Sequence, residues 1–393
     1  MTSSEAMGGP HRIGVFTAAR SDGVPLGPVL AALEAAPDVE CVVIATGGHL
    51  EESRGRTVDH LAVSRRCVEI VDVVAETSAA GALTEAAARM TQGIGEVLER
   101  RRIETLVVLG DRWELLAAST AALLGNVALV HLHGGEITAG SIDDRIRHAV
   151  AKLADLHCCA NDDSARRLRQ LGEDAARVVV TGAPGLDRHR GRGPVADEDL
   201  EATLGHRVAR PFGLVTYHPE TIERHSVGER AEQVVEAAAR RLGTALVLYP
   251  GVDQGADEVV DAIEAVAARH GHVHTRPHVG DDYALLLAAA DVMIGNSSSG
   301  IWESATFALP VVDVGNRQRG RLAPANVLWA DYCDGAIERA IDRALAPSFR
   351  SSLLGMSNPY GDGDAARRIV EAVRSLPRIR PLPKVFRDLE EAL

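Results

Sequence analysis

Short apolar runs rich in β-branched residues alternate along this chain with longer segments whose apolar residues recur at helical spacing. Each short run is followed by Gly, His or Asp and then by an amphipathic stretch. This order is typical of a parallel sheet whose two faces are both covered by helices. In the first half of the chain the runs are 13–18, 42–46, 105–109, 128–131 and 178–181. The alternation predicts an α/β fold of the doubly wound, Rossmann-like kind.

The alternation stops over residues 187–211, where Arg, Gly, Pro and acidic residues dominate, and then starts again. The second set of runs is 212–216, 245–249, 273–275, 291–295 and 311–314. A chain of 393 residues is also too long for one hydrophobic core. We therefore expect a first domain over 1–190, a second over 211–363 and a helical tail over 364–393 that packs back on the first. Ligands of such folds bind beyond the carboxyl ends of the strands, so we expect the active site in the cleft between the domains.

Composition excludes several classes of protein. The formal net charge of -13 argues against broad binding to nucleic acid or to a membrane surface. No apolar run approaches the roughly 20 residues of a membrane span, and the polar N-terminus lacks a signal pattern, so we expect a cytoplasmic protein. The cysteines lie in apolar segments without CxxC spacing, which predicts buried thiols and neither disulfides nor a zinc site. They are Cys41, Cys67, Cys158, Cys159 and Cys333.

Two polar clusters directly follow predicted strands of the first domain. Asp111 and Arg112 come after the run 105–109, where the Asp could cap a helix or act on a ligand. The segment HLHGGE comes after the run 128–131 and brackets two glycines with His133 and Glu136. Paired glycines let the backbone approach a ligand, while the flanking side chains could carry protons. No G-x-G-x-x-G or Walker motif is present, so a dinucleotide cofactor is not indicated.

A third cluster opens a predicted helix whose apolar residues begin at Ile146. Capping-box spacing between Ser141 and Asp144 makes one acidic residue a helix cap, but it leaves Asp143 unexplained. Asp143 and Arg147 lie four apart, so they could form an ordinary ion pair or hold a carboxylate at the cleft. Both interpretations stay open from the residues alone.

The second domain carries groups that suit a nucleotide. His218 ends a strand, and the segment GNSSSGIWE places hydroxyls and backbone N–H groups at a predicted helix N-terminus, which is what a phosphate requires. Glu303 in that helix suits the diol of a ribose, and Arg317 could neutralise phosphate charge. Together with the carboxylates of the first domain, this set suggests proton transfer on the sugar of a nucleotide sugar.

The blocks GDRWELLAAS, HLHGGEITAGSIDDRIRHAVAKLADLH, VTYHPET, IGNSSSGIWE and GNRQRGRL resemble the hydrolysing UDP-N-acetylglucosamine 2-epimerases, of the type in bacterial sialic-acid pathways. The resemblance covers nearly the whole chain in order. It implies two Rossmann-like domains of the GT-B type and a cytoplasmic homodimer or homotetramer. It also implies anti-elimination of UDP and hydration of 2-acetamidoglucal to N-acetylmannosamine, with no metal and no nicotinamide cofactor.

The resemblance also implies a set of site residues. The implied catalytic residues are Asp111, His133, Glu136, Asp143, Asp144, Arg147 and His218. The implied UDP-sugar ligands are Arg20, His49, Arg112, Gly182, His218, Asp253, Val279, Ser297, Ser298, Glu303 and Arg317. Many family members have Glu at the position of His133, which leaves open whether His133 or Glu136 is catalytic here.

Four other functions remain open from the sequence. One is the same reaction on UDP-N,N'-diacetylbacillosamine. The two substrates differ only in the groups on C4 and C6 of the sugar, and no motif indicates which groups the protein binds there. A non-hydrolysing 2-epimerase ranks lower because it lacks the GGE…IDD…IRHA arrangement. A GT-B glycosyltransferase would not need paired carboxylates at Asp143 and Asp144, and Asp111 and His218 argue against an inactive UDP-sugar sensor.

Overall fold

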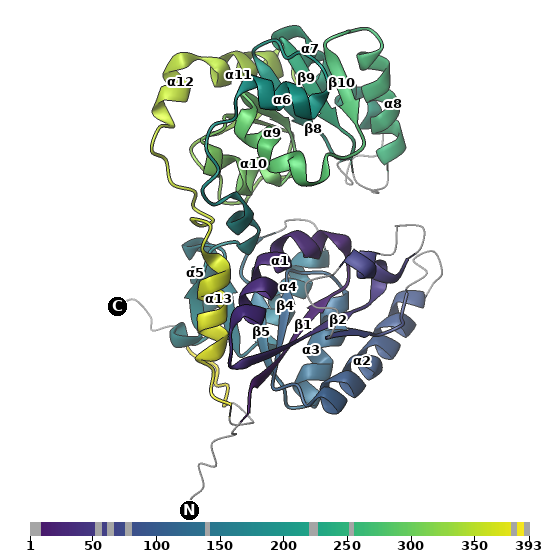
Figure 1. Ribbon diagram of the computed structural model, residues 1–393, viewed down its shortest axis with the longest axis vertical. Helices are drawn as coiled ribbons and strands as arrows, with labels where there is room; N and C mark the ends of the chain where they lie inside the picture. The colour runs from purple at the N-terminus through teal and green to yellow at the C-terminus, as the bar shows by residue number, and fades with distance from the viewer. Residues whose placement is uncertain are drawn as a thin grey trace, which may run out of the picture. The chain divides into compact units, whose positions relative to one another are not determined.

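The computed structural model contains two units, and the chain returns to the first unit after it has formed the second (Figure 1). The first comprises Met1–Arg188 together with Tyr360–Leu393, and the second comprises His189–Pro359. The predicted domains 1–190 and 211–363, with a tail over 364–393 packing back on the first, stay a prediction. The residues described are 9–51, 57–60, 67–74, 81–137, 142–219, 227–250, 255–378 and 383–388.

The first unit is built on a parallel sheet of seven strands in the order β3-β2-β1-β4-β5-β6-β7. The strands are β1 (His11–Thr17), β2 (Val39–Ala45), β3 (Val68–Ile70), β4 (Thr105–Leu109), β5 (Ala128–Leu132), β6 (Leu156–Cys159) and β7 (Val178–Val180). The helices are α1 (Arg20–Ala35), α2 (Ala82–Arg101), α3 (Glu114–Leu124), α4 (Ile142–Leu153), α5 (Asp162–Gln170) and α13 (Ala365–Arg374). The strand order reverses between β1 and β4, which is where ligands of doubly wound folds bind.

The second unit has a six-stranded parallel sheet in the order β10-β9-β8-β11-β12-β13, which reverses between β8 and β11. Its strands are β8 (Phe212–Thr216), β9 (Thr244–Leu248), β10 (Val273–Arg276), β11 (Val292–Gly295), β12 (Val311–Val314) and β13 (Val327–Ala330). The helices are α6 (Asp197–Leu204), α7 (Val227–Arg241), α8 (Ala256–Ala267), α9 (Tyr283–Ala289), α10 (Ser299–Trp302), α11 (Ala336–Leu345) and α12 (Pro347–Ser352). Two parallel-sheet α/β units confirm the predicted fold class.

Both faces of the first sheet are buried, as the continuous apolar runs predict. Along β4, Val107 packs on the face covered by α1 and α13, whereas Leu106 and Val108 pack on the face covered by α2 and α3. The C-terminal helix α13 contributes Ile369 and Val373 to the first of these cores and lies beside α1 (Figure 1). The core of the first unit therefore depends on residues from both ends of the chain.

Several details differ from the sequence-based expectations. The polar segment after residue 190 contains a helix, α6, whose Leu200 and Leu204 are buried. Strands β3, β6 and β13 were not predicted. The expectation that all cysteines are buried is wrong for Cys333, which is exposed, and for Cys67, which is half-buried.

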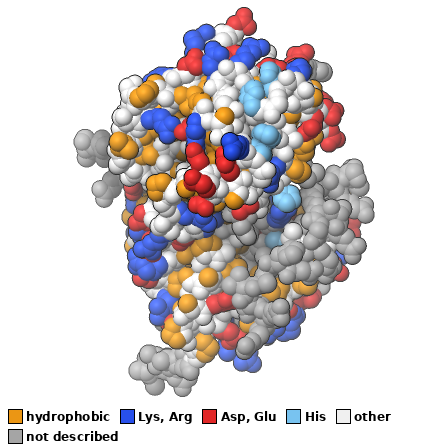
Figure 2. All heavy atoms as spheres, turned by 45° about the horizontal axis from the view of Figure 1, so that its top comes forward, with side chains coloured by type: hydrophobic (Ala, Val, Ile, Leu, Met, Phe, Trp, Pro, Cys, Tyr) orange, Lys and Arg blue, Asp and Glu red, His pale blue; other side chains and the backbone are white. Residues whose placement is uncertain are grey.

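The surface mixes charges of both signs. On the face in Figure 2, acidic and basic side chains are interspersed, with hydrophobic side chains scattered between them. Within the described part of the chain, no helix combines the length and apolar character that crossing a membrane requires.

Candidate functional site

The predicted residues of the first unit all follow the carboxyl ends of its strands. Arg20 follows β1 and is exposed at the start of α1, while His49 follows β2 in the short 3-10 helix Gly47–Leu50. Asp111 and Arg112 follow β4, and His133 and Glu136 follow β5. In a parallel sheet these ends share one edge, so the fold gathers residues from distant parts of the sequence there.

An ion pair joins two of the predicted clusters. The guanidinium of Arg147, whose side chain is only 5% exposed, donates from Nη2 to Oδ2 of Asp111. Its Nη1 lies 3.9 Å from Oδ1 of Asp144, one turn earlier on α4. The described contacts of Arg147 are thus with Asp111 and Asp144, and the pair with Asp143 stays a prediction. A buried guanidinium with carboxylates on either side holds the end of β4 against the first turns of α4.

A second pair joins the two residues that bracket the glycines. Nδ1 of His133 lies 2.6 Å from Oε1 of Glu136, and both side chains are less than a tenth exposed. Because an ionised carboxylate can only accept, Nδ1 of His133 is the donor in this hydrogen bond. This arrangement, a carboxylate that orients an imidazole, is suited to carrying protons.

Arg112 lies in an acidic setting. Its Nη2 donates to Oε1 of the buried Glu114 at 2.8 Å. Burial alone would lower the pKa of the Arg112 guanidinium, but the hydrogen bond to Glu114 and the nearby charges of Asp22 and Asp143 raise it. Arg112 therefore stays charged, and it lies within the electrostatic reach of Asp143.

His49 is almost fully buried and hydrogen-bonded on both sides. Its Nε2 lies 2.7 Å from Oγ1 of Thr17, and its Nδ1 lies 2.8 Å from Oγ1 of Thr57. Burial lowers the pKa of the imidazole, so the ring is neutral at neutral pH. Asp22 completes this group by accepting from Thr17 Oγ1 and from the backbone N–H of Ala18. The structure thus gives His49 a role in shaping the turns after β1 and β2.

Gly182 follows β7 at the same edge of the sheet. Its φ of +90° and the nearness of the Tyr360 carbonyl, 3.2 Å from a built Cβ, explain the glycine. The described neighbours of Gly182 include Cys159, the segment Tyr360–Gly361 and Ala365, and none of them belongs to the Asp111 or His133 pairs.

In the second unit, the side chain of Asn296 organises the predicted nucleotide residues. Its Oδ1 accepts from the backbone N–H of His218 at 2.7 Å, and its Nδ2 donates to the carbonyl of His218 at 2.9 Å. Its own carbonyl accepts from Arg317 Nη1 at 3.1 Å and from Gln318 Nε2 at 2.9 Å. Asn296 therefore ties together the ends of β8, β11 and β12 at the point where the strand order reverses.

The predicted helix after β11 is a single turn, α10, followed by the 3-10 turn Ser304–Phe307. A turn this short has little macrodipole, so the hydroxyls and backbone N–H groups are what this segment offers a phosphate, and that role stays a prediction. Among the described residues, nothing accepts from the backbone N–H groups of Ser297 and Ser298. Glu303, just after α10, accepts from Nε2 of the buried His189 at 2.8 Å.

Of the two remaining predicted ligands, one has no described contact with this group and the other lies outside the described residues. Val279 is half-buried after β10, and none of its described contacts reaches Asn296 or Glu303. Asp253 lies outside the described residues. Within those residues, no group of three or more His, Cys, Asp or Glu side chains is arranged to hold a metal ion.

Comparison with known proteins now decides the family. A family model described as UDP-N-acetylglucosamine 2-epimerase matches residues 31–374. The chain belongs to this epimerase family.

Two curated relatives and one solved structure illustrate the likeness. A protein of Legionella pneumophila named UDP-N,N'-diacetylbacillosamine 2-epimerase (hydrolyzing) is 32% identical, over 93% of this chain and 96% of its own length. A UDP-N-acetylglucosamine 2-epimerase of Neisseria meningitidis is 29% identical, over 85% of this chain and 87% of its own. The crystal structure of a Neisseria meningitidis UDP-GlcNAc 2-epimerase bound to UDP-GlcNAc has a TM-score of 0.72 at 17% identity, over 93% of this chain and 100% of the other. These findings confirm the resemblance and the GT-B type fold.

Sequence reasoning gave no role to three residues that the structure places among the epimerase-family motifs. Glu114 holds Arg112, Asn296 holds His218 and Arg317, and His189 holds Glu303. Glu114 and Asn296 stand within the quoted motifs, so their position was a usable signal. His189 lies in the polar segment between the two sets of strands, where no local pattern marks it as a partner of Glu303.

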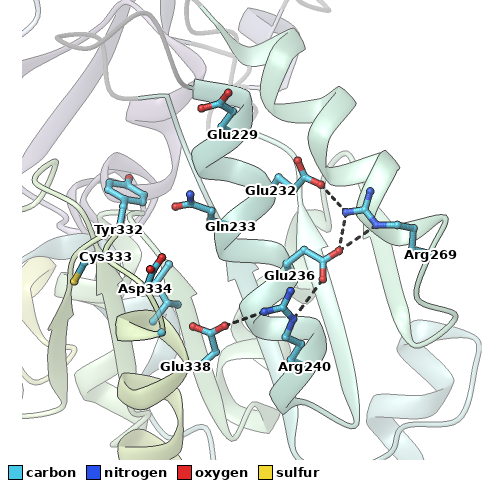
Figure 3. A pocket seen from close by; sticks show the side chains of 12 residues that line it. Glu229, Glu232, Gln233, Glu236, Arg240, Arg269, Tyr332, Cys333, Asp334 and Glu338 are labelled. Atoms are coloured by element: carbon cyan, nitrogen blue, oxygen red, sulfur yellow. Dashed lines mark hydrogen bonds and ion pairs between the residues drawn. The ribbon is translucent and has the colours of Figure 1, made fainter.

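A groove of about 560 Å³ lies on the second unit, and none of the residues that line it belongs to these epimerase-family motifs (Figure 3). Carboxylates of α7 and α11 line it, and Arg269 and Arg240 bridge them by ion pairs. The loop after β13 adds Tyr332 and Cys333. The two arginines are thus engaged with carboxylates of the groove wall.

Proposed function

We propose that this chain is a hydrolysing 2-epimerase of UDP-N-acetylglucosamine, which releases UDP and N-acetylmannosamine. The observation that carries the proposal is the pair of proton-carrying groups at the ends of two adjacent strands. One is the His133–Glu136 pair after β5, and the other is Asp111, held by Arg147, after β4.

The chemistry requires more than one proton carrier. Elimination removes the weakly acidic proton from C2 as UDP leaves C1, and hydration returns a proton to C2 while water attacks C1. Inversion at C2 means that the proton leaves one face of the sugar and returns to the other, so one fixed group cannot serve both faces. The His133–Glu136 pair and the carboxylate of Asp111 would supply two proton carriers, each at the end of a different strand.

The second unit offers the groups that UDP needs. The N–H groups of Ser297 and Ser298 and the guanidinium of Arg317 would hold the diphosphate, and the departing charge would be neutralised there. Glu303 would accept from the ribose hydroxyls, since a carboxylate beside the diphosphate itself would be repelled. His218, clamped by Asn296, would complete the nucleotide-binding set.

A second candidate is the same reaction on UDP-N,N'-diacetylbacillosamine. The 32% identity of the Legionella pneumophila relative supports it. The two substrates share the UDP group and the C1–C2 region of the sugar, so the same residues would serve both reactions. They differ at C4 and C6 of the sugar.

Proton NMR of the protein with each UDP-sugar in deuterium oxide tests the proposal. Free UDP with N-acetylmannosamine deuterated at C2 would support hydrolytic epimerisation of UDP-N-acetylglucosamine. Turnover of UDP-N,N'-diacetylbacillosamine alone would support the second candidate. Formation of an intact UDP-N-acetylmannosamine would instead show a non-hydrolysing epimerase, and both sugars left unchanged would contradict the proposal.

A further inference from the structure

A short C-terminal segment, residues 383–388, belongs to the first unit and packs there against residues that lie far from it in the sequence. The carbonyl of Pro383 accepts from Arg177 Nη2 at 2.7 Å, and the backbone N–H of Arg387 donates to the carbonyl of Gly172 at 3.0 Å. The ring of Phe386 covers Gly172, where a built Cβ would lie 2.6 Å from ring carbons. The segment is therefore held by several contacts of different kinds.

At the centre of these contacts lies a buried carboxylate. The Glu173 side chain is 2% exposed and is approached by three nitrogen atoms. They are Lys152 Nζ at 2.6 Å, Lys384 Nζ at 2.7 Å and His157 Nε2 at 3.0 Å. Burial alone would raise the pKa of Glu173, but the hydrogen bonds from His157, Lys152 and Lys384 lower it to about 2. Glu173 is therefore a charged anchor at neutral pH.

Lys384 also reaches the end of α4. Its Nζ donates to the carbonyl of Ala151 at 3.3 Å and to the carbonyl of Ala154. The last carbonyls of a helix have no partner within the helix, and a lysine ammonium placed there satisfies them and favours the negative end of the helix dipole. Lys152 ties the same end of α4 to Glu173 and to the carbonyl of Leu171.

The other end of α4 carries the acidic cluster of the proposed active site. Asp143 and Asp144 stand in its first turn, and Arg147 pairs with Asp111 one turn later. Helix α4 contains neither Pro nor Gly, the usual causes of a kink, so a loss of hold at one end displaces groups at the other. Displacement of about 1 Å in catalytic groups can cost about a hundred-fold in rate.

We propose that Lys384 is a positioning residue: by joining the end of α4 to Glu173, it keeps Arg147 and Asp144 in place against Asp111. The C-terminal segment then contributes to catalysis by holding α4 in position. The inference rests on the proposed function for its kinetic readout. Without Lys384 the Glu173 carboxylate keeps Lys152 and His157 as partners, so a substitution of Lys384 does not leave a buried charge unpaired.

The test compares three full-length variants with the wild-type protein. Lys384→Met keeps the length of the side chain and removes the cation, and Lys384→Arg keeps the cation. Arg387→Ala is the matched control, because it removes another cation of the same segment that pairs with Asp174 through an exposed side chain. The measurements are kcat and KM for the UDP-sugar, and hydrogen exchange of the amides of α4.

We expect Lys384→Met to lower kcat about ten-fold with KM changed less than two-fold, since most of the proposed UDP-sugar ligands lie in the other unit. Exchange in α4 should quicken, while exchange in β1 and β4 stays as in the wild type. Lys384→Arg should recover most of kcat, and Arg387→Ala should match the wild type. If Lys384→Met leaves both kcat and α4 exchange unchanged, the proposal is wrong.

Equal acceleration of exchange throughout the first unit would also overturn it, because Lys384 would then only stabilise the fold. A wild-type protein without turnover would count against the proposed function instead. In that case the α4 exchange of Lys384→Met, compared with Arg387→Ala, still decides whether Lys384 holds the helix.

Discussion

His133 and Glu136 can pair because the backbone between them makes a turn that few sequences allow. His133 itself has a φ of +61° and Gly135 a φ of +80°. A built Cβ on Gly135 would lie 2.2 Å from the carbonyl oxygen of Ser164, so only glycine fits. Backbone strain in a residue other than glycine is costly and is usually found where function needs a particular geometry. The strain at His133 therefore supports its place among the functional residues.

Exchange of Asp111 for Asn tests the other pair. Asp111→Asn removes a negative charge and a proton acceptor but keeps an oxygen that accepts from Arg147. We expect kcat to fall by about a hundred- to a thousand-fold, while the circular dichroism spectrum stays that of the wild type. The matched control is Asp38→Asn, which removes an exposed ion pair with Arg374 in the same unit. Near-normal turnover of Asp111→Asn would exclude Asp111 from the chemistry.

Glu173 gives a prediction about pH. Its pKa is lowered to about 2 in the folded protein from an ordinary value of 4.5, so its charge stabilises the fold above pH 4.5. That stabilisation is lost as the pH falls from 4.5 to about 2. We expect Glu173→Gln to be less stable than the wild type at pH 7, and the gap in free energy of unfolding to narrow through this range. Urea unfolding at several pH values measures it, and a constant gap would show that the charge of Glu173 is not what stabilises the fold.

At the scale of elements, the pattern of apolar runs predicted most of the sheet and failed for identifiable reasons. The predicted central strands, such as β4 and β8, have the predicted bounds because continuous burial demands apolar runs. β3 is a three-residue edge strand with an exposed Ile70, and β6 contains His157, so neither is an apolar run. The residues near Asp111 and His218 were predictable from motifs at strand ends. The roles of His189 and Lys384 were not, because their partners lie more than a hundred residues away.

The junction of β8 and β11 gives a prediction at this scale. Gly295 has a φ of +134°, and a built Cβ would lie 2.0 Å from the carbonyl oxygen of Thr216. Gly295→Ala should force the two strands apart beside the Asn296–His218 clamp, lowering the free energy of unfolding by at least about 3 kcal/mol. Chemical denaturation measures this loss. Gly271→Ala, where a Cβ meets open space, is the control and should change stability little.

At the scale of the whole molecule, each unit has its own sheet and its own core, so a ligand can stabilise one without the other. If UDP binds through Ser297, Ser298 and Glu303, saturation at about a hundred times Kd should add about 2.7 kcal/mol to the stability of the second unit. Hydrogen exchange should then slow in β8 and β11 more than in β1 and β4. Glu303→Ala should reduce this protection, whereas Glu338→Ala, in the groove on the same unit, should keep it. Equal protection of both sheets would contradict the assignment of UDP to the second unit.

The interrupted path of the chain has a consequence for how the protein is made. Helix α13, which packs on α1, leaves the ribosome after the whole of the second unit. At about 5–20 residues per second, synthesis of residues 189–359 takes on the order of ten to thirty seconds. During that time every strand of the first sheet has been synthesised, but the part of α1 that α13 covers is exposed. The second unit would therefore be completed before the first during synthesis. Chaperones that recognise exposed apolar helices would bind the nascent chain at α1 of the first unit.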